Sequence, residues 1–263
     1  MSTIKDLQDK KASGQKITSL TAYDFTTAQV LEAAGIDMIL VGDSLGMVVY
    51  GYDSTVYVTM DDMIRHTQAV SRGVSKTLVI ADMPFGSYHA SLEETVHNAA
   101  SLVQAGANGV KVEGATPFVL DVIRRLTEAG ILVVAHLGFT PQQVNRIGGN
   151  RVQGRDEVAA QVLLQDAKAV VEAGAQLLVL EMVPAELAAT ITASITVPTI
   201  GIGAGPDCDG QILVVHDLLG LFTSFTPRFV KRYANLAVDM KLAVEQYIRD
   251  INEGIFPSKE HGF

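Results

Sequence analysis

Several short apolar segments of this chain end in a residue that can bind a cation or move a proton. The run Met38-Ile-Leu-Val41 is followed by Gly42-Asp43-Ser44, and two later runs end at Asp82 and Glu113. Runs of this length, rich in branched side chains, are typical of strands buried on both faces of a parallel sheet. The carboxyl ends of such strands carry the chemistry of parallel α/β folds. Asp43, Ser44, Asp82 and Glu113 are therefore candidate site residues.

The three carboxylates among them come from three consecutive predicted strands. Adjacent strands lie about 4.8 Å apart, so Asp43, Asp82 and Glu113 could converge on one divalent cation, directly or through water. Ligands that are all oxygen atoms favour Mg²⁺, Ca²⁺ or Mn²⁺ over zinc. The alternative for each acid taken alone is a helix N-cap or an acid of a solvent-facing loop.

Three further candidates end or interrupt apolar strands. Lys111 lies between Val110 and Val112, which predicts a side chain inside the barrel, where a lysine needs a partner. It could form a structural ion pair, hold a substrate oxygen, or form a Schiff base. His136 is a hydrogen-bond donor to substrate or a core histidine. Glu181 lies away from the three acids in strand order and has no evident cationic neighbour in sequence, so we expect it to be a general base.

Two glycine-bearing segments leave alternatives open. Gly201-Ile-Gly-Ala-Gly205 lacks the spacing of a dinucleotide or P-loop motif, so a tight turn is favoured over a phosphate site. Between Asn145 and Arg155, arginines alternate with glycines, which fits a solvated loop, a mobile lid or an anion contact.

A repeated pattern indicates the elements that position these residues. A helical segment, an Ala-Gly pair and an apolar strand recur in that order, and glycine after a helix readily adopts the left-handed conformation that ends it. Eight alternating units predict a single-domain (β/α)8 TIM barrel over residues 1–263, with an open doubly wound sheet as the alternative. We also expect an N-terminal helix over 3–14 and a C-terminal helical extension over 228–252. The predicted strands are 17–23, 38–43, 77–82, 109–113, 131–136, 177–181, 198–202 and 212–216.

Composition narrows the classes of function. The net charge of −9 argues against an electrostatic grip on nucleic acid or anionic lipid. The single cysteine, Cys208, excludes an intrachain disulfide framework. No apolar run approaches the roughly 18 residues of a membrane span. A cytoplasmic protein with small-molecule substrates is expected.

Eight motifs follow one another along almost the whole chain: Thr21-Ala-Tyr-Asp24, Gly42-Asp-Ser-Leu-Gly-Met47, Ala81-Asp-Met-Pro-Phe85, Val110-Lys-Val-Glu-Gly114, His136-Leu-Gly-Phe-Thr-Pro-Gln142, Leu177-Leu-Val-Leu-Glu181, Gly201-Ile-Gly-Ala-Gly205 and Asp209-Gly-Gln-Ile-Leu213. Their order and spacing jointly resemble those of the ketopantoate hydroxymethyltransferase family. One departure is Val56-Tyr57, where the family pattern has Leu-Pro.

The resemblance implies a barrel of the phosphoenolpyruvate/pyruvate superfamily, a homodecamer with one Mg²⁺ per subunit, and 5,10-methylenetetrahydrofolate as co-substrate. It implies that Asp43, Asp82 and Glu113 serve the metal and that Glu181 is the proton acceptor. Substrate contacts would come from Asp43, Ser44, Asp82 and Lys111, to which strand-end position adds His136. The implied reaction is hydroxymethyl transfer to 3-methyl-2-oxobutanoate through a metal-stabilised enolate, giving ketopantoate in pantothenate biosynthesis. The alternative is a Mg²⁺-dependent 2-oxo acid lyase of the same superfamily.

Overall fold

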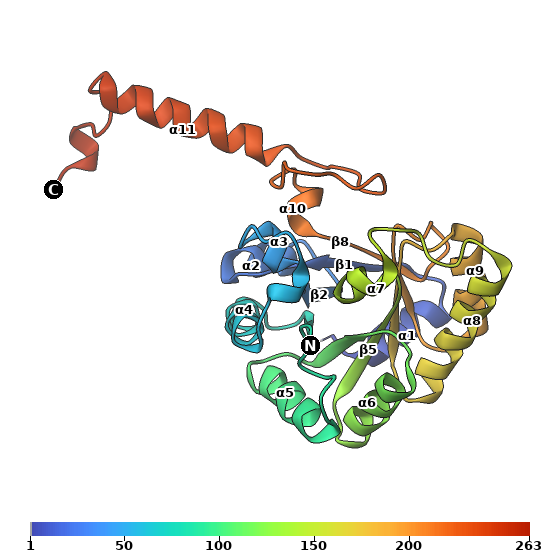
Figure 1. Ribbon diagram of the computed structural model, residues 1–263. Coiled ribbons are helices and arrows are strands. Elements are labelled where there is room, and N and C mark those ends of the chain that lie inside the picture. Colours follow the sequence, from blue (N-terminus) through green and yellow to red (C-terminus); the bar gives the residue numbers. More distant parts are fainter. Residues whose placement is uncertain (1) are drawn as a thin grey trace. The chain divides into compact units, whose positions relative to one another are not determined.

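The computed structural model describes residues 2–263, which divide into two compact units, Met1–Val214 and Val215–Phe263. The first unit contains a closed barrel of eight parallel strands that pair in chain order, with the last strand paired to the first (Figure 1). The predicted (β/α)8 barrel is therefore confirmed. Its strands are β1 Ile17–Thr21, β2 Met38–Val41, β3 Leu78–Asp82, β4 Gly109–Glu113, β5 Leu132–Gly138, β6 Leu177–Glu181, β7 Thr199–Ile202 and β8 Gly210–Leu213.

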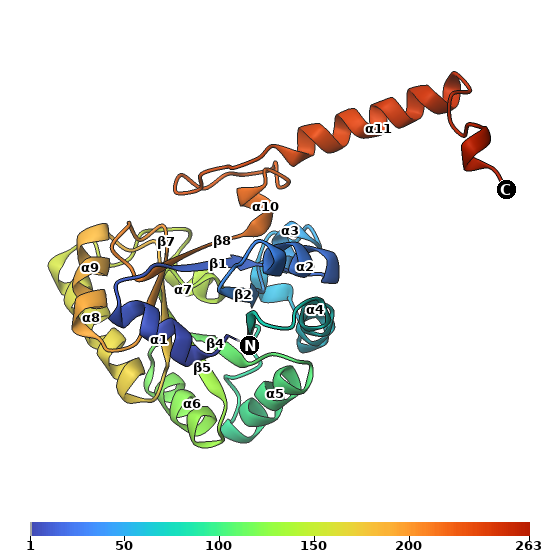
Figure 2. The same cartoon turned by 180° about the vertical axis from the view of Figure 1, so that it is seen from behind.

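Helices surround the barrel in the first unit, as seen from opposite sides in Figures 1 and 2. The α-helices of the first unit are α1 Ile4–Ala12, α2 Phe25–Ala33, α3 Leu45–Val48, α4 Met60–Gly73, α5 Leu92–Gln104, α6 Pro117–Glu128, α7 Val144–Ile147, α8 Glu157–Glu172 and α9 Ala185–Ser194. Two 3-10 turns join them, η1 Thr55–Tyr57 and η2 Pro141–Gln143. The second unit contains α10 Val215–Leu218, α11 Leu236–Asn252 and η3 Lys259–His261.

Local sequence signals explain where the helices begin and end. The glycines of the four Ala-Gly pairs, at 35, 106, 130 and 174, all have positive φ angles, as a helix end followed by a strand requires. Thr59 and Asp62 form a capping box at the start of α4, and Pro117 occupies the first turn of α6.

The interior of the barrel is filled by inward-facing apolar side chains of the strands. Lys111 and the strand-end acids are buried toward the carboxyl ends of the strands. The apolar interior of the barrel is therefore a packed core, and the polar side chains gather at its carboxyl end. The buried cluster consists of Leu7, Ile17, Met38, Leu40, Leu78, Ile80, Val134, Leu177, Val179, Ile200 and Ile212.

Two sequence-based boundaries near the C-terminus are wrong. The eighth strand, predicted at 212–216, covers Gly210–Leu213, and the residues after it form α10. The helical region predicted over 228–252 begins as a helix only at Leu236. The segment before it instead bonds to the end of α10, since Tyr233 N–H donates to the Leu218 carbonyl at 2.8 Å.

Within residues 2–263, no helix combines the length and the apolar character that crossing a bilayer requires.

Candidate active site

Strand register brings the predicted site residues to one edge of the barrel. Asp82 on β3 pairs with Lys111 on β4, and Glu113 on β4 pairs with His136 on β5. Glu181 ends β6 opposite Gly138 of β5. Each of these side chains therefore extends from the carboxyl half of its strand toward the same end of the barrel.

The three predicted carboxylates are buried and adjacent. Asp43, Asp82 and Glu113 are each 4% exposed or less. The main-chain N–H of Asp43 donates to Asp82 Oδ2 at 2.9 Å. Lys111 Nζ lies 3.1 Å from Asp82 Oδ1 and 3.6 Å from Glu113 Oε1. Lys111 thus points into the barrel as predicted, with two acids as ion-pair partners.

His136 lies between two glutamates, one on each side of its ring. Its Nδ1 is 3.3 Å from Glu113 Oε1, and its Nε2 is 3.3 Å from Glu181 Oε2. Lys111 Nζ is also 3.2 Å from Nδ1, but one nitrogen cannot both accept from a lysine and donate to a carboxylate. Burial and Lys111 lower the pKa of His136, yet the two glutamates outweigh them and raise it to about 9. The two glutamates thus favour a proton on the ring, although Nε2 makes no hydrogen bond in this geometry.

The shared burial also shifts the pKa values of the acids. Burial, and then repulsion from Asp82 and Glu113, raise the pKa of Asp43 well above its usual range. Burial raises the pKa of Asp82 despite the neighbouring Lys111. Burial alone would raise the pKa of Glu113 too, but Lys111 and His136 hold it below its usual range. Negative charge is most costly at Asp43 and Asp82, so this is where a cation would be most stabilising.

The donor set fits a hard divalent cation. Asp82 Oδ1 is buried and accepts no hydrogen bond, although Lys111 Nζ is at ion-pair distance. Across the described residues 2–263, no three His, Cys, Asp or Glu side chains are arranged to hold a metal by themselves. Mg²⁺ commonly uses one or two carboxylates and completes its shell with water and substrate oxygens. Asp43, Asp82 and Glu113 are therefore the protein groups that would hold it, directly or through water.

Ser44 lies beside this cluster at the first residue before α3. Its Oγ is 2.9 Å from the hydroxyl of Tyr23, which follows β1. This contact fixes the serine hydroxyl next to Asp43, where the sequence predicts a substrate contact.

Two residues without a predicted role also contact the acids. Gln142 donates from its side chain to Asp43 and from its main chain to Glu113, and Tyr88 donates to Gln142. Gln142 lies in η2 and Tyr88 in the loop before α5. No strand pattern marks these positions. The only sequence signal is that Gln142 ends one of the motifs shared with the family.

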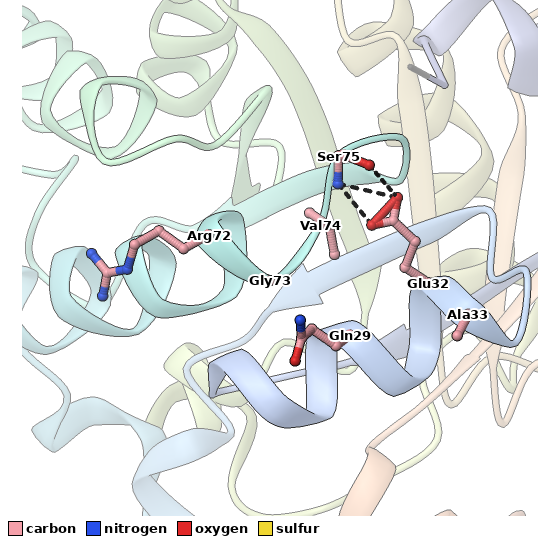
Figure 3. Close-up of a pocket in the computed structure, with 7 residues that line it drawn as sticks. All are labelled: Gln29, Glu32, Ala33, Arg72, Gly73, Val74 and Ser75. Carbon is pink, nitrogen blue, oxygen red and sulfur yellow. Dashed lines mark hydrogen bonds between the residues drawn. The ribbon is translucent and has the colours of Figure 1, made fainter.

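A shallow pocket on the first unit is separate from the candidate active site. Its residues belong to α2, to the end of α4 and to the loop after α4 (Figure 3). They precede β2 and β3 in the chain, so the pocket lies toward the amino ends of these strands. Glu32 is already bonded there by the main-chain N–H of Ser75 at 2.7 Å. The lining residues are Gln29, Glu32, Ala33, Arg72, Gly73, Val74 and Ser75.

The fold and the cluster at its strand ends define a (β/α)8-barrel enzyme. Residues 1–259 match the ketopantoate hydroxymethyltransferase family. The chain therefore belongs to that family. Two relatives are named 3-methyl-2-oxobutanoate hydroxymethyltransferase. The one from Syntrophus aciditrophicus is 53% identical over 99% of this chain and 96% of the relative. The one from Moorella thermoacetica is 55% identical over 99% of this chain and 97% of the relative.

Solved structures of more distant proteins share the fold. A phosphonopyruvate hydrolase in complex with oxalate and Mg²⁺ superposes with a TM-score of 0.63 at 16% identity, covering 99% of this chain and 93% of that one. A 2,3-dimethylmalate lyase of the PEP mutase/isocitrate lyase superfamily superposes with a TM-score of 0.60 at 15% identity, covering 100% and 92%. At sequence identities this low, the similarity shows a shared barrel fold and nothing more.

Proposed function

We propose that this enzyme transfers a hydroxymethyl group from 5,10-methylenetetrahydrofolate to 3-methyl-2-oxobutanoate, giving ketopantoate. Family membership over residues 1–259 supports the reaction. The observation that carries it at the site is the convergence of Lys111 with three buried carboxylates beside Glu181 and His136. A 2-oxo acid is an anion whose reaction builds further charge on its keto oxygen, and such a site can stabilise that charge.

Each side chain has a distinct task in the proposed reaction. Lys111, kept cationic by Asp82 and Glu113, attracts the carboxylate or keto oxygen of the substrate. Ser44, oriented by Tyr23, donates a hydrogen bond to the same group of atoms. Asp43, Asp82 and Glu113 would hold a divalent cation. When bound, this cation supplies positive charge next to the oxygen on which the enolate charge develops.

Glu181 is the proposed proton acceptor. It removes the proton from C3 of the oxo acid, and the electron pair of that bond moves toward the keto oxygen. The resulting enolate carbon forms a bond to the one-carbon unit of the folate, whose two bonds to folate nitrogen break while water supplies the oxygen of the new hydroxyl. The proton from C3 and the two protons of water end on the two nitrogens of the departing tetrahydrofolate and on that hydroxyl. His136, with Nε2 at 3.3 Å from Glu181, keeps the carboxylate turned toward the site before the transfer.

The experiment that tests this function is deuterium exchange at C3 of 3-methyl-2-oxobutanoate, with and without folate, in buffer containing Mg²⁺. We expect exchange in both conditions and ketopantoate only when 5,10-methylenetetrahydrofolate is present. The absence of both deuterium exchange and ketopantoate would overturn the proposal. Cleavage of a carbon–carbon bond in a 2-oxo acid without folate would instead identify a lyase of the same superfamily.

Three further properties follow from family membership as proposals: one Mg²⁺ per subunit, a homodecameric assembly and a cytoplasmic location. The assembly is checked by sedimentation equilibrium, where a decamer has ten times the 28.1 kDa chain mass. A smaller particle mass across micromolar concentrations contradicts it.

A further inference from the structure

Gln142 uses its side-chain amide and its main-chain N–H within the candidate site. It is 4% exposed. Its side-chain Nε2 donates to Asp43 Oδ2 and to the Met83 carbonyl, both at 2.9 Å. Its Oε1 accepts from the Tyr88 hydroxyl at 2.7 Å. Its main-chain N–H donates to Glu113 Oε2 at 3.1 Å. Two acceptors on one side and a donor on the other match a carboxamide, whereas a carboxylate would repel Asp43.

These bonds join the ends of four successive strands. Asp43 follows β2, Met83 follows β3, Glu113 ends β4, and Gln142 itself lies in η2 after β5. Tyr88 completes the connection, because its hydroxyl oxygen also accepts from the main-chain N–H of Glu113 at 3.1 Å. Loops that carry separate acids are thereby fixed relative to one another by one amide and one phenol.

The three acids share a pattern of contacts. One oxygen of each is held by an amide N–H: Gln142 Nε2 holds Asp43 Oδ2, the Asp43 main chain holds Asp82 Oδ2, and the Gln142 main chain holds Glu113 Oε2. On Asp82 and Glu113 the opposite oxygen faces Lys111 Nζ, at 3.1 and 3.6 Å. The amides thus fix the rotation of each carboxylate. They leave the second oxygens of Asp43 and Asp82 for a cation or a substrate, whereas that of Glu113 also lies 3.3 Å from His136 Nδ1.

We propose that Gln142 is a positioning residue that, together with Tyr88, sets the orientation of Asp43 and Glu113 toward the bound cation. The inference rests on the proposed function, since it concerns the same acids. Hydrogen-bonded partners that orient metal-binding side chains commonly contribute 10- to 100-fold to metal affinity. A residue that only closes buried hydrogen bonds would affect folding and leave that affinity unchanged.

The test measures Mn²⁺ binding to the purified full-length protein without substrate, by electron paramagnetic resonance of the free ion. Gln142→Met keeps an unbranched side chain of similar length and removes both the amide donors and the acceptor. We expect it to weaken Mn²⁺ binding by about 10-fold or more. Tyr88→Phe keeps the Asp43 contact but frees the amide to rotate, so we expect a smaller weakening in the same direction.

Thr192→Val is the matched control. Thr192 is buried in α9 and its hydroxyl donates to the Ala188 carbonyl at 2.7 Å, so the change also removes a buried hydrogen bond, away from the site. We expect a lower melting temperature for this variant with unchanged Mn²⁺ affinity.

The outcomes separate the inference from the function on which it rests. Equal Mn²⁺ affinity in wild type and Gln142→Met, or in Tyr88→Phe if Gln142→Met does not fold, would overturn the positioning role. A wild-type protein that binds no Mn²⁺ would overturn the metal-dependent function itself, and the inference with it.

Discussion

Glu181 has a neighbour that its sequence context does not indicate. His136 lies two residues before Gly138, the register partner of Glu181, and its imidazole Nε2 is 3.3 Å from Glu181 Oε2. Pairing between β5 and β6 creates this contact, so it appears only in the structure. The other ring nitrogen, Nδ1, lies 3.3 Å from Glu113 Oε1, so the proposed base shares a buried histidine with one of the three acids.

Glu181→Gln tests the base with little change of shape. The amide removes the basic oxygen and leaves the metal-side acids in place, so binding of the oxo acid should survive. We expect C3 deuterium exchange and ketopantoate formation to fall by at least about 10²-fold, the usual contribution of general-base catalysis. Exchange is followed by proton NMR of the substrate. Wild-type exchange in this variant would assign the proton transfer to another group.

Lys111 is expected to act by its charge. Burial lowers the pKa of Lys111, but Asp82, Glu113 and Asp43 outweigh burial and raise it above its usual value. A protonated amine cannot attack a carbonyl, so Schiff-base chemistry is disfavoured. Borohydride added with 3-methyl-2-oxobutanoate should leave the intact protein mass unchanged. Lys111→Met should weaken oxo-acid binding in calorimetry. A reduced adduct on Lys111 would contradict this prediction.

At the scale of elements, periodicity and capping signals predict most of the barrel. The strands predicted at 109–113 and 177–181 have those bounds in the structure. The eighth strand is misplaced because the apolar run near Val215 suits a strand or a helix equally well. The helix predicted to begin at 228 begins only at Leu236, since main-chain bonds to the end of α10 hold the preceding segment. Leu236 N–H, for example, donates to the Leu219 carbonyl at 2.9 Å.

The candidate site is predictable only where its residues belong to strands or follow them directly, as Asp43 and Ser44 follow β2. Strand ends place Asp82, Lys111 and Glu113 together because parallel strands share one edge. Gln142 and Tyr88 lie in loops, and their contacts depend on how those loops fold over the barrel. No pattern in the sequence indicates how close these loop residues come to the acids, so their part in the site emerges only from the structure.

The turn that leads from β5 toward η2 depends on Gly138. Its φ is +95°, and a Cβ there would lie 2.2 Å from the Glu181 carbonyl oxygen. Gly138→Ala should therefore destabilise the fold by about 2 kcal/mol or more, from backbone strain and from the clash. Gly130→Ala is the control, because Gly130 has φ +82° with nothing within 4 Å. Urea unfolding measures both. Equal losses would show that the approach of β6 does not constrain Gly138.

At the scale of the whole molecule, the buried acids oppose folding when no cation is bound. The pKa of Asp43 is raised in the folded state, mainly by burial, so the folded protein holds this proton more tightly than the unfolded chain. Stability is therefore lost as pH rises from the usual aspartate range through the raised pKa of Asp43. At neutral pH, a divalent cation that binds only the folded state should restore the stability lost in this way.

Cation removal should thus change stability as well as turnover. EDTA should abolish product formation, and Mg²⁺ or Mn²⁺ should restore it. Saturation at about 100 times Kd adds roughly 2.7 kcal/mol of stability, which differential scanning calorimetry detects as a higher melting temperature.

Asp43→Asn separates this effect from nonspecific ion binding. The variant removes the most destabilised charge and preserves side-chain shape, so in EDTA it should melt at least as high as wild type. It should also lose most of the Mg²⁺-induced rise, because a carboxamide is a poor substitute for an anionic ligand. A full Mg²⁺-induced rise in Asp43→Asn would place the stabilising ion elsewhere on the protein. A much lower melting temperature in EDTA would mean that Asp43 stabilises the folded state without metal, and that the buried acids are a structural network.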